Sequence, residues 1–280
     1  MITSDAHRVL QRVACAASLV AVTSCQSVQT TQGGEVGVTR KQTMTSMVSA
    51  QEVEQQAAKE YAQVLAQAQK KGLLNANPQQ VQRVRAVAQR LIPQVAVFRS
   101  DAVNWKWEVN VLTSKDINAW CMPGGKIAVY SGLMERLNLT DDELAAVMGH
   151  EIAHALREHA RERMGRQMAT QTATAVGAVA LEIFTGVRID PELAGTVAQA
   201  TFVLPNSREN EQESDFIGVE LAARAGYDPR AALTLWQKMG QAASGGPPEW
   251  LSTHPNNETR LRELQAYVQK VMPLYEKAPK

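Results

Sequence analysis

The residues best suited to chemistry form one short segment, His150-Glu151-Ile152-Ala153-His154. On a helix, histidines four residues apart lie one turn apart on one face, separated by about 6 Å along the axis. Their imidazoles can hold a zinc ion, and the glutamate between them can act as a general base on a zinc-bound water. The pattern therefore predicts Zn²⁺, one ion per chain, as the cofactor and Glu151 as a catalytic residue.

A catalytic zinc ion takes three protein ligands and keeps one position for water, so a third ligand is required. Glu211 and Asp215 are four residues apart and would share one face of a helix. One of them can bind the metal while the other accepts a hydrogen bond from a ligating imidazole, and Gly218 on that face would allow close helix packing. The alternative is an exposed acidic helix start that the helix dipole stabilises.

Two further histidines fall outside this pattern. His159 lies five residues beyond His154, about 140° around the helix, so we expect it to point elsewhere as a structural or surface group. His254 precedes a proline in a predicted loop. It is a candidate catalytic residue, either as a donor to the oxyanion or as a latch on the open metal position; a surface loop histidine is equally compatible with the spacing.

The helix that carries the two histidines should begin at Thr140, because Thr140 to Glu143 forms a capping box. Apolar residues at helical spacing follow, and basic residues favour a carboxyl end near Gly165. Further helices are predicted over residues 49–74, 78–92, 207–225, 228–241 and 257–272, and strands over 105–113, 118–122 and 126–131, the last two joined by a tight antiparallel turn. The fold class is α+β: a mainly helical domain with a small antiparallel sheet of three to four strands.

The amino terminus is predicted to be a lipoprotein signal peptide over residues 1–24. Two arginines precede an uncharged run, which ends in Val22-Thr23-Ser24-Cys25, similar to a lipobox. Cys25 would then be the lipidated first residue of a periplasm-facing lipoprotein, and Gln26 after it implies sorting to the outer membrane. Residues 25–48 would form a flexible tether, and residues 49–280 the metal-binding domain.

Composition gives no support for a nucleic-acid-binding protein or for a membrane span within the domain. Lysine plus arginine number 29 and aspartate plus glutamate 28; without the predicted leader each is 27, which gives no indication of nucleic-acid binding. Cys121 is expected to be a small buried residue in a strand. The apolar stretch over residues 167–204 is interrupted by charges before it reaches the length of a membrane span.

Taken together, these motifs resemble peptidase family M48, the gluzincins. The resemblance rests on H-E-x-x-H, on Ser207-Arg208 with Glu211 and Asp215, and on the segments Asn118-Ala119, Pro123-Gly124-Gly125 and Ser131-Gly132-Leu133. The lipobox and the His254-Pro255 element are similar to the periplasmic, BepA- and LoiP-like branch. The resemblance implies a zinc metalloendopeptidase that acts on unfolded or misassembled envelope proteins; a zinc-stabilised chaperone or assembly factor is the alternative.

The resemblance also implies roles for individual residues. His150, His154 and Glu211 would bind zinc, Glu151 would be the general base, and Asp215 would support a ligand. Asn118 and Ala119 would bind substrate backbone, because an exposed sheet edge beside the site can pair with an extended peptide.

Overall fold

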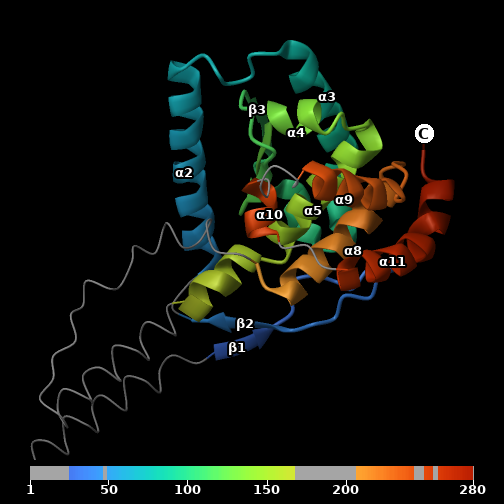
Figure 1. The fold of residues 1–280 in the computed structure, drawn as a ribbon. Coiled ribbons are helices and arrows are strands. Elements are labelled where there is room, and N and C mark those ends of the chain that lie inside the picture. Colours follow the sequence, from blue (N-terminus) through green and yellow to red (C-terminus); the bar gives the residue numbers. More distant parts are fainter. Residues whose placement is uncertain (1–24, 47–48, 168–205, 243–248, 255–257, 280) are drawn as a thin grey trace, which may run out of the picture.

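The computed structural model describes residues 25–46, 49–167, 206–242, 249–254 and 258–279. Helices surround a small sheet, and α5 runs through the middle of the molecule (Figure 1). The elements are β1 Cys25–Val28, β2 Gln42–Thr45, α2 Ala50–Lys70, α3 Pro78–Leu91, the 3₁₀ helices η1 Ile92–Val97 and η2 Ser100–Asn104, β3 Glu108–Leu112, β4 Ala119–Met122, β5 Lys126–Tyr130, α4 Ser131–Arg136, α5 Asp141–Leu156, α8 Arg208–Arg224, α9 Ala231–Ala242, α10 Glu249–Thr253 and α11 Glu258–Lys277. This arrangement confirms the predicted mainly helical α+β class.

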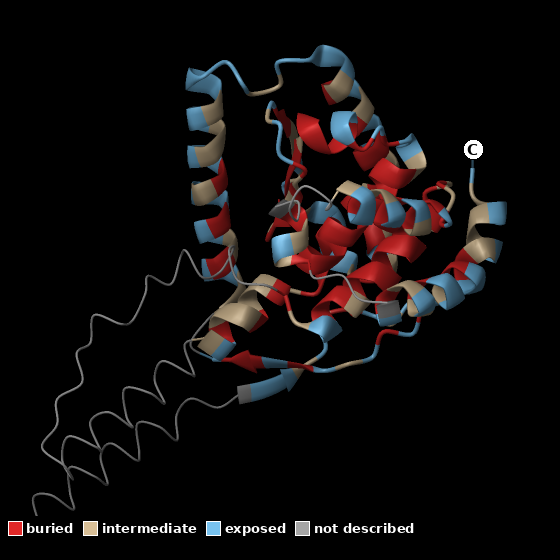
Figure 2. Ribbon diagram, viewed as in Figure 1, coloured by how far each residue is buried: buried red, intermediate tan, exposed pale blue. Residues whose placement is uncertain are grey.

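Helix α5 begins as its capping box predicts. The Thr140 hydroxyl accepts a hydrogen bond from the backbone N–H of Glu143, and the Glu143 carboxylate accepts one from the N–H of Thr140. Every residue from Glu143 to Leu156 is buried, which Figure 2 shows as a continuous buried helix at the centre of the fold. The histidine-bearing segment therefore lies in the interior of the fold.

The carboxyl end of α5 differs from the sequence prediction. The helix stops at Leu156 instead of running to Gly165, because Glu158 adopts a left-handed backbone conformation with φ 51°, and helix resumes at residues 159–167. Side chains from elsewhere bind the carbonyls at this break: Gln42 donates to the Arg157 carbonyl, and Arg99 to that of Leu156. The break separates the helical residues 159–167 from α5.

Helices α5 and α8 pack with their backbones in close contact. A Cβ atom added to Gly149 would lie 2.7 Å from the Gly218 carbonyl oxygen, and one added to Gly218 would lie 2.7 Å from the backbone nitrogen of His150. Only residues without a side chain fit at this crossing. The predicted role of Gly218 is confirmed, and α8 starts where Ser207 caps it by accepting a hydrogen bond from the Asn210 N–H.

The main sheet has the strand order β3-β5-β4. Strands β4 and β5 pair antiparallel through the turn in which Gly124 and Gly125 have positive φ, as predicted. Strands β3 and β5, however, pair parallel, so the prediction of a purely antiparallel sheet is wrong. The chain reverses direction between β3 and β4 and again at the β4–β5 turn, so β5 runs in the direction of β3 and lies between the other two strands. This order leaves β4 at an edge of the sheet, against α5.

The segment predicted to be a flexible tether has regular structure and packs against the core within residues 25–46. Strands β1 and β2 pair antiparallel, Val36 and Val38 are buried in the main core, and the Val36 N–H donates to Glu220 of α8 over 2.8 Å. Apolar periodicity does not reveal this packing, because the segment contributes single valines and buried polar groups. The predicted signal peptide, residues 1–24, and the apolar stretch at 168–204 lie outside the described residues.

Among the described residues, no helix combines the length and apolar character that a membrane crossing demands.

Candidate metal centre

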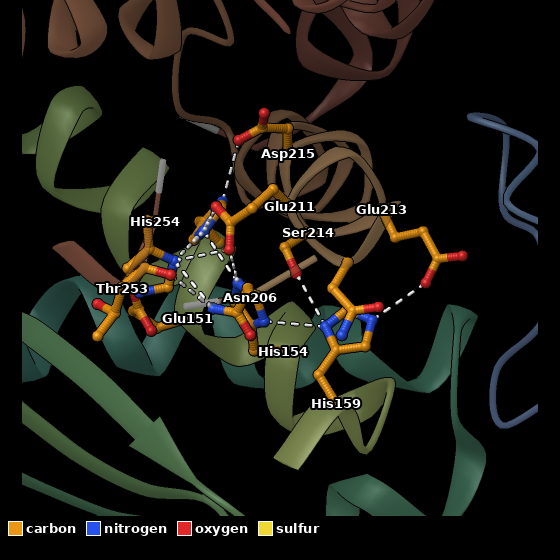
Figure 3. A network of polar contacts seen from close by, with 12 residues as sticks. Glu151, His154, His159, Asn206, Glu211, Glu213, Ser214, Asp215, Thr253 and His254 are labelled. Atoms are coloured by element: carbon orange, nitrogen blue, oxygen red, sulfur yellow. Dashed lines mark hydrogen bonds and ion pairs between the residues drawn. The ribbon is translucent and has the colours of Figure 1, made fainter. Parts of the chain in front are cut away.

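Four buried side chains converge between α5, α8 and the residue that follows α10. They are His150, His154, Glu211 and His254, and one ligand atom from each lies within 4.8 Å of all the others. His150 Nε2 is 3.1 Å from His154 Nε2 and 3.2 Å from His254 Nδ1, and Glu211 Oε1 is 3.0 Å from His254 Nδ1 and 3.3 Å from His154 Nε2. Figure 3 shows His154, Glu211 and His254 pointing toward one another.

The donor set fits a divalent metal ion. Zinc bound tetrahedrally at 2.0–2.1 Å separates its ligand atoms by about 3.3 Å, close to the spacing of these nitrogen and oxygen atoms. Two neutral imidazole nitrogens that face each other can share only one hydrogen. Hydrogen bonds alone therefore cannot pair all the nitrogen and oxygen atoms that face one another in this cluster. Burial lowers the pKa of His150, but the carboxylates of Asp215 and Glu211 raise it to about 9, so the acidic groups favour a positive charge here.

Glu211 and Asp215 divide the two roles that their spacing predicts. Glu211 lies among the ligand atoms, whereas Asp215 Oδ1 lies 3.0 Å from His150 Nδ1, on the side of the ring away from the cluster. Arg260 of α11 binds both carboxylates: its Nε donates to Asp215 over 2.8 Å, and its Nη1 is 2.9 Å from Glu211 Oε2. Burial raises the pKa of Glu211, but the charge of His254 and hydrogen bonds from the histidines bring it well below its usual value.

Glu151 lies beside the cluster and is not part of it. Its carboxylate is buried and accepts a hydrogen bond from Trp250 Nε1 over 2.6 Å, and His254 Nε2 is 3.5 Å from the same oxygen. Glu151 also lines a cavity of about 340 Å³ together with His154 and His254. A carboxylate held next to a metal site and open to a cavity is positioned to exchange protons with a bound water.

His254 contributes a donor atom to the cluster. Its position follows from the short helix α10: the His254 N–H donates to the Trp250 carbonyl, and the Trp250 ring stacks on the imidazole at 4.7 Å between centroids. Of the two functional alternatives, this geometry favours the metal latch, because Nδ1 lies next to Glu211 and His150 where a fourth ligand would be. The loop-surface alternative is wrong, since only 6 % of the residue is exposed.

The predicted substrate-binding residues form one wall of the same cavity. Asn118 and Ala119 line it, at the start of the edge strand β4. The Asn118 side-chain oxygen accepts the Ala119 N–H over 2.9 Å, which fixes the amide at the entrance to the strand. Their contact with substrate stays a prediction, as does lipidation of Cys25. Cys121 is buried as expected, and its sulfur approaches the Met122 carbonyl.

His159 is the residue that sequence reasoning placed incorrectly. It is fully buried, its Nδ1 lies 2.9 Å from His154 Nδ1, and its Nε2 lies 3.0 Å from Glu213. The helical angle of about 140° does not apply, because the left-handed Glu158 separates the two histidines. No spacing rule signals this contact in advance.

The fold and the site define a zincin-like metallopeptidase domain, and comparison with known proteins agrees. The model of peptidase family M48 matches residues 78–268, which is more than half of the chain. This protein belongs to peptidase family M48.

Curated relatives of two kinds match the chain. It is 36% identical to the mitochondrial metalloendopeptidase OMA1 of Arabidopsis thaliana over 56% of this chain and 31% of that protein. The OMA1 of Schizosaccharomyces pombe is 33% identical over 58% of this chain and 47% of that protein. The beta-barrel assembly-enhancing protease of Escherichia coli K12 is 29% identical over 71% and 41%, respectively. The match thus spans less than half the length of each of these relatives.

Proposed function

We propose that this protein is a metal-dependent endopeptidase in which Glu151 is the general base. The observation that carries the proposal is the buried Glu151 carboxylate, which lies beside a His-His-Glu cluster and lines the same cavity as the edge strand β4. A purely structural metal site needs no adjacent unliganded carboxylate. When bound, zinc would act as a Lewis acid and lower the pKa of its water from about 15.7 to about 7.

Residues of this chain would transfer the proton, orient the metal ligands and bind the substrate. Glu151 accepts a proton from the attacking water and returns it to the leaving amine, and the Trp250 N–H holds the Glu151 carboxylate in one orientation. Asp215 binds Nδ1 of His150, so that Nε2 keeps its lone pair for the metal. Asn118 and Ala119 at the β4 edge would bind the main chain of an extended peptide, which selects unfolded sequences with little regard to side chains.

The proposed substrates are unfolded or misassembled envelope proteins, and the proposed location is the periplasmic face of the outer membrane. The lipobox ending at Cys25 and the relative named beta-barrel assembly-enhancing protease support this assignment. Mutation of Cys25 to serine, followed by membrane fractionation and labelling with a fatty acid, tests the anchor. Fractionation of Cys25→Ser with the membrane as in the wild type would contradict it.

The second candidate is a zinc-stabilised chaperone or assembly factor for outer-membrane proteins with little proteolysis. The observation that favours it is His254, whose Nδ1 lies among the ligand atoms where a water would otherwise bind. A latch at His254 makes the two functions compatible, because substrate would have to displace it before hydrolysis.

Metal analysis of the purified protein combined with a proteolysis assay tests the proposal. The substrates are unfolded outer-membrane proteins, with and without a chelator. We expect one zinc ion per chain and cleavage that stops on chelation and returns with zinc. A protein that binds zinc and clients but cleaves none of them, even after His254→Ala, would favour the chaperone; a protein that binds no metal would overturn both candidates.

A further inference from the structure

The group behind His154 is unusual for a metal ligand, because it is another imidazole. Metal-ligating histidines commonly donate their second ring N–H to a carboxylate, a carbonyl or a water. His150 follows this rule with Asp215. His154 Nδ1 instead faces His159 Nδ1 at 2.9 Å, and the rings cross edge to face at 4.9 Å between centroids.

The position of the hydrogens in this pair follows from the atoms on either side. His159 Nε2 faces the carboxylate of Glu213 at 3.0 Å, so it carries a hydrogen and donates it. His154 needs a lone pair on Nε2 to bind metal, so its hydrogen is on Nδ1. His159 Nδ1 is then the acceptor, and the Ser214 hydroxyl, 3.4 Å from the same nitrogen, is its other polar neighbour.

The chain of contacts continues to the amino-terminal segment. Glu213 Oε2 accepts from Arg157 Nε over 2.9 Å and from Arg40 Nη2 over 3.1 Å, and Arg40 also binds Glu162 through two hydrogen bonds. Arg40 lies just before β2, in the segment whose own carbonyl at residue 40 accepts from Arg157. Glu213 is therefore fixed from two directions, and its lone pairs point where His159 needs them.

We propose that His159 is a positioning residue of the metal centre, which holds His154 in the ligating tautomer, and that Glu213 and Arg40 hold His159 in turn. The inference rests on the proposed metal site and extends it. Its geometric basis is a continuous series of contacts from the partly exposed Arg40 to the buried Glu213, His159 and His154, and Figure 3 shows the last three of these residues. The amino-terminal segment then supports metal binding from a distance in sequence of more than one hundred residues.

Three variants of the full chain test the inference. His159→Phe keeps a ring in the buried position but removes both hydrogen bonds; His159→Gln keeps an acceptor for His154 and a donor for Glu213. The third, Arg40→Gln, removes the distal charge. Arg83→Gln is the matched control, because Arg83 is about as exposed as Arg40 and pairs with Asp141 at the amino end of α5, away from Glu213 and the helix break.

The readouts are zinc affinity, measured by competition with a chromophoric chelator, and the visible absorption spectrum of the Co²⁺-substituted protein. Circular dichroism of each metal-free variant checks folding. We expect His159→Phe to weaken zinc binding by about 10- to 100-fold, as loss of a ligand's hydrogen-bond partner does elsewhere, and to change the Co²⁺ spectrum. His159→Gln should recover most of the affinity, Arg40→Gln should show a smaller loss, and Arg83→Gln should match the wild type.

Two results separate the inference from the proposed function. If the wild type binds zinc and cleaves substrate while folded His159→Phe keeps wild-type affinity and spectrum, the positioning role is wrong and the peptidase stands. If the wild type binds no zinc, the peptidase proposal fails first. If His159→Phe does not fold, the other two variants decide. Wild-type affinity and spectrum in Arg40→Gln, together with a large loss of zinc affinity in His159→Gln, would overturn the proposed role of the contacts from Arg40 to His154.

Discussion

The two imidazoles of the metal helix are supported from opposite ends of the chain. His150 rests on Asp215, whose carboxylate Arg260 holds from the carboxyl-terminal helix α11. His154 rests on His159, which leads through Glu213 to the amino-terminal segment. We refer to these as the C-terminal support and the N-terminal support.

One helix supplies the carboxylates of both supports. Two residues along an α-helix correspond to a turn of about 200°, so Glu213 faces away from Glu211 and Asp215. The C-terminal support reaches its imidazole directly because Asp215 shares a face with the ligand Glu211, whereas the N-terminal support needs His159 as an intermediate. Helix α8 therefore supports both imidazoles. Asp215 contacts His150 directly, and Glu213 reaches His154 only through His159.

The largest expected effect is that of Glu151→Gln, which should abolish cleavage without disturbing either support. Glu151→Gln should leave zinc binding intact, because Glu151 belongs to neither support nor to the ligand atoms. Cleavage should fall by at least about 10²- to 10⁴-fold, the usual contribution of a general base. Measurement of zinc content and casein cleavage checks this, and cleavage by Glu151→Gln at the wild-type rate would show that the base assignment is wrong.

The next prediction compares the two arginines by the free energy of unfolding of the metal-free protein. Arg260→Met should cost about 3–5 kcal/mol, because it leaves the buried carboxylates of Asp215 and Glu211 without their cation. Arg40→Met should cost less, since Arg40 is 27 % exposed in its side chain against 3 % for Arg260, and Arg157 still binds Glu213. Urea unfolding of both variants gives the order, and equal losses would contradict it.

The helix crossing that serves both supports can be tested with one methyl group. Gly149→Ala would place Cβ 2.7 Å from the Gly218 carbonyl oxygen and should destabilise the protein by about 1–3 kcal/mol through overpacking. Gly240→Ala in α9 is the matched control, because among the described residues no atom beyond its own helix backbone lies within 4 Å of the added Cβ. Thermal unfolding compares the two; a loss of equal size in Gly240→Ala would argue against the crossing as the cause.

Acid should weaken the N-terminal support through Glu162, the carboxylate that binds Arg40. Burial raises the pKa of Glu162, but hydrogen bonds and charge from Arg40 lower it to about 2. A pKa depressed on folding stabilises the protein above the unfolded value near 4.5, and this stabilisation is lost as pH falls from about 5 to 2. Denaturation between pH 7 and 2 should show this slope, worth up to about 3 kcal/mol, and Glu162→Gln should flatten it. An unchanged slope in that variant would show that other groups cause it.

The smallest expected effect concerns His254, which belongs to neither support. If it is a latch, His254→Ala should raise proteolysis by several-fold while zinc content stays near one per chain, because His150, His154 and Glu211 remain as ligands. An oxyanion donor would instead lower the rate, by about 2.7–4 kcal/mol of transition-state stabilisation. Rates on casein at matched zinc content decide the sign, and no change would exclude both roles.

The comparison of the two supports also shows how far sequence reasoning reaches. The metal helix, its capping box and the pairing of Glu211 with Asp215 could be predicted, since each depends on residues within one turn of each other. The contact of His159 could not, because it depends on a left-handed residue at Glu158 that no local propensity requires. The same limit explains the sheet, where β3 pairs in parallel with a strand two elements later.

The amino-terminal segment shows a different limit. Its composition of glutamine, threonine, glycine and valine is that of a linker, yet β1 pairs with β2 and the segment binds distant partners such as Glu220 and Glu213. Segments of this kind have too few apolar residues to reveal burial through periodicity.

The order of the site residues along the chain has a consequence for biosynthesis. A polypeptide that has emerged only as far as His154 carries two imidazoles and the base, while the third ligand, Glu211, follows 57 residues later and Arg260 later still. Under the proposed function, a growing or truncated chain that lacks α8 is therefore an incomplete hydrolase. Such a chain cannot cleave neighbouring unfolded chains before α8 and α11 have been synthesised and the site has formed.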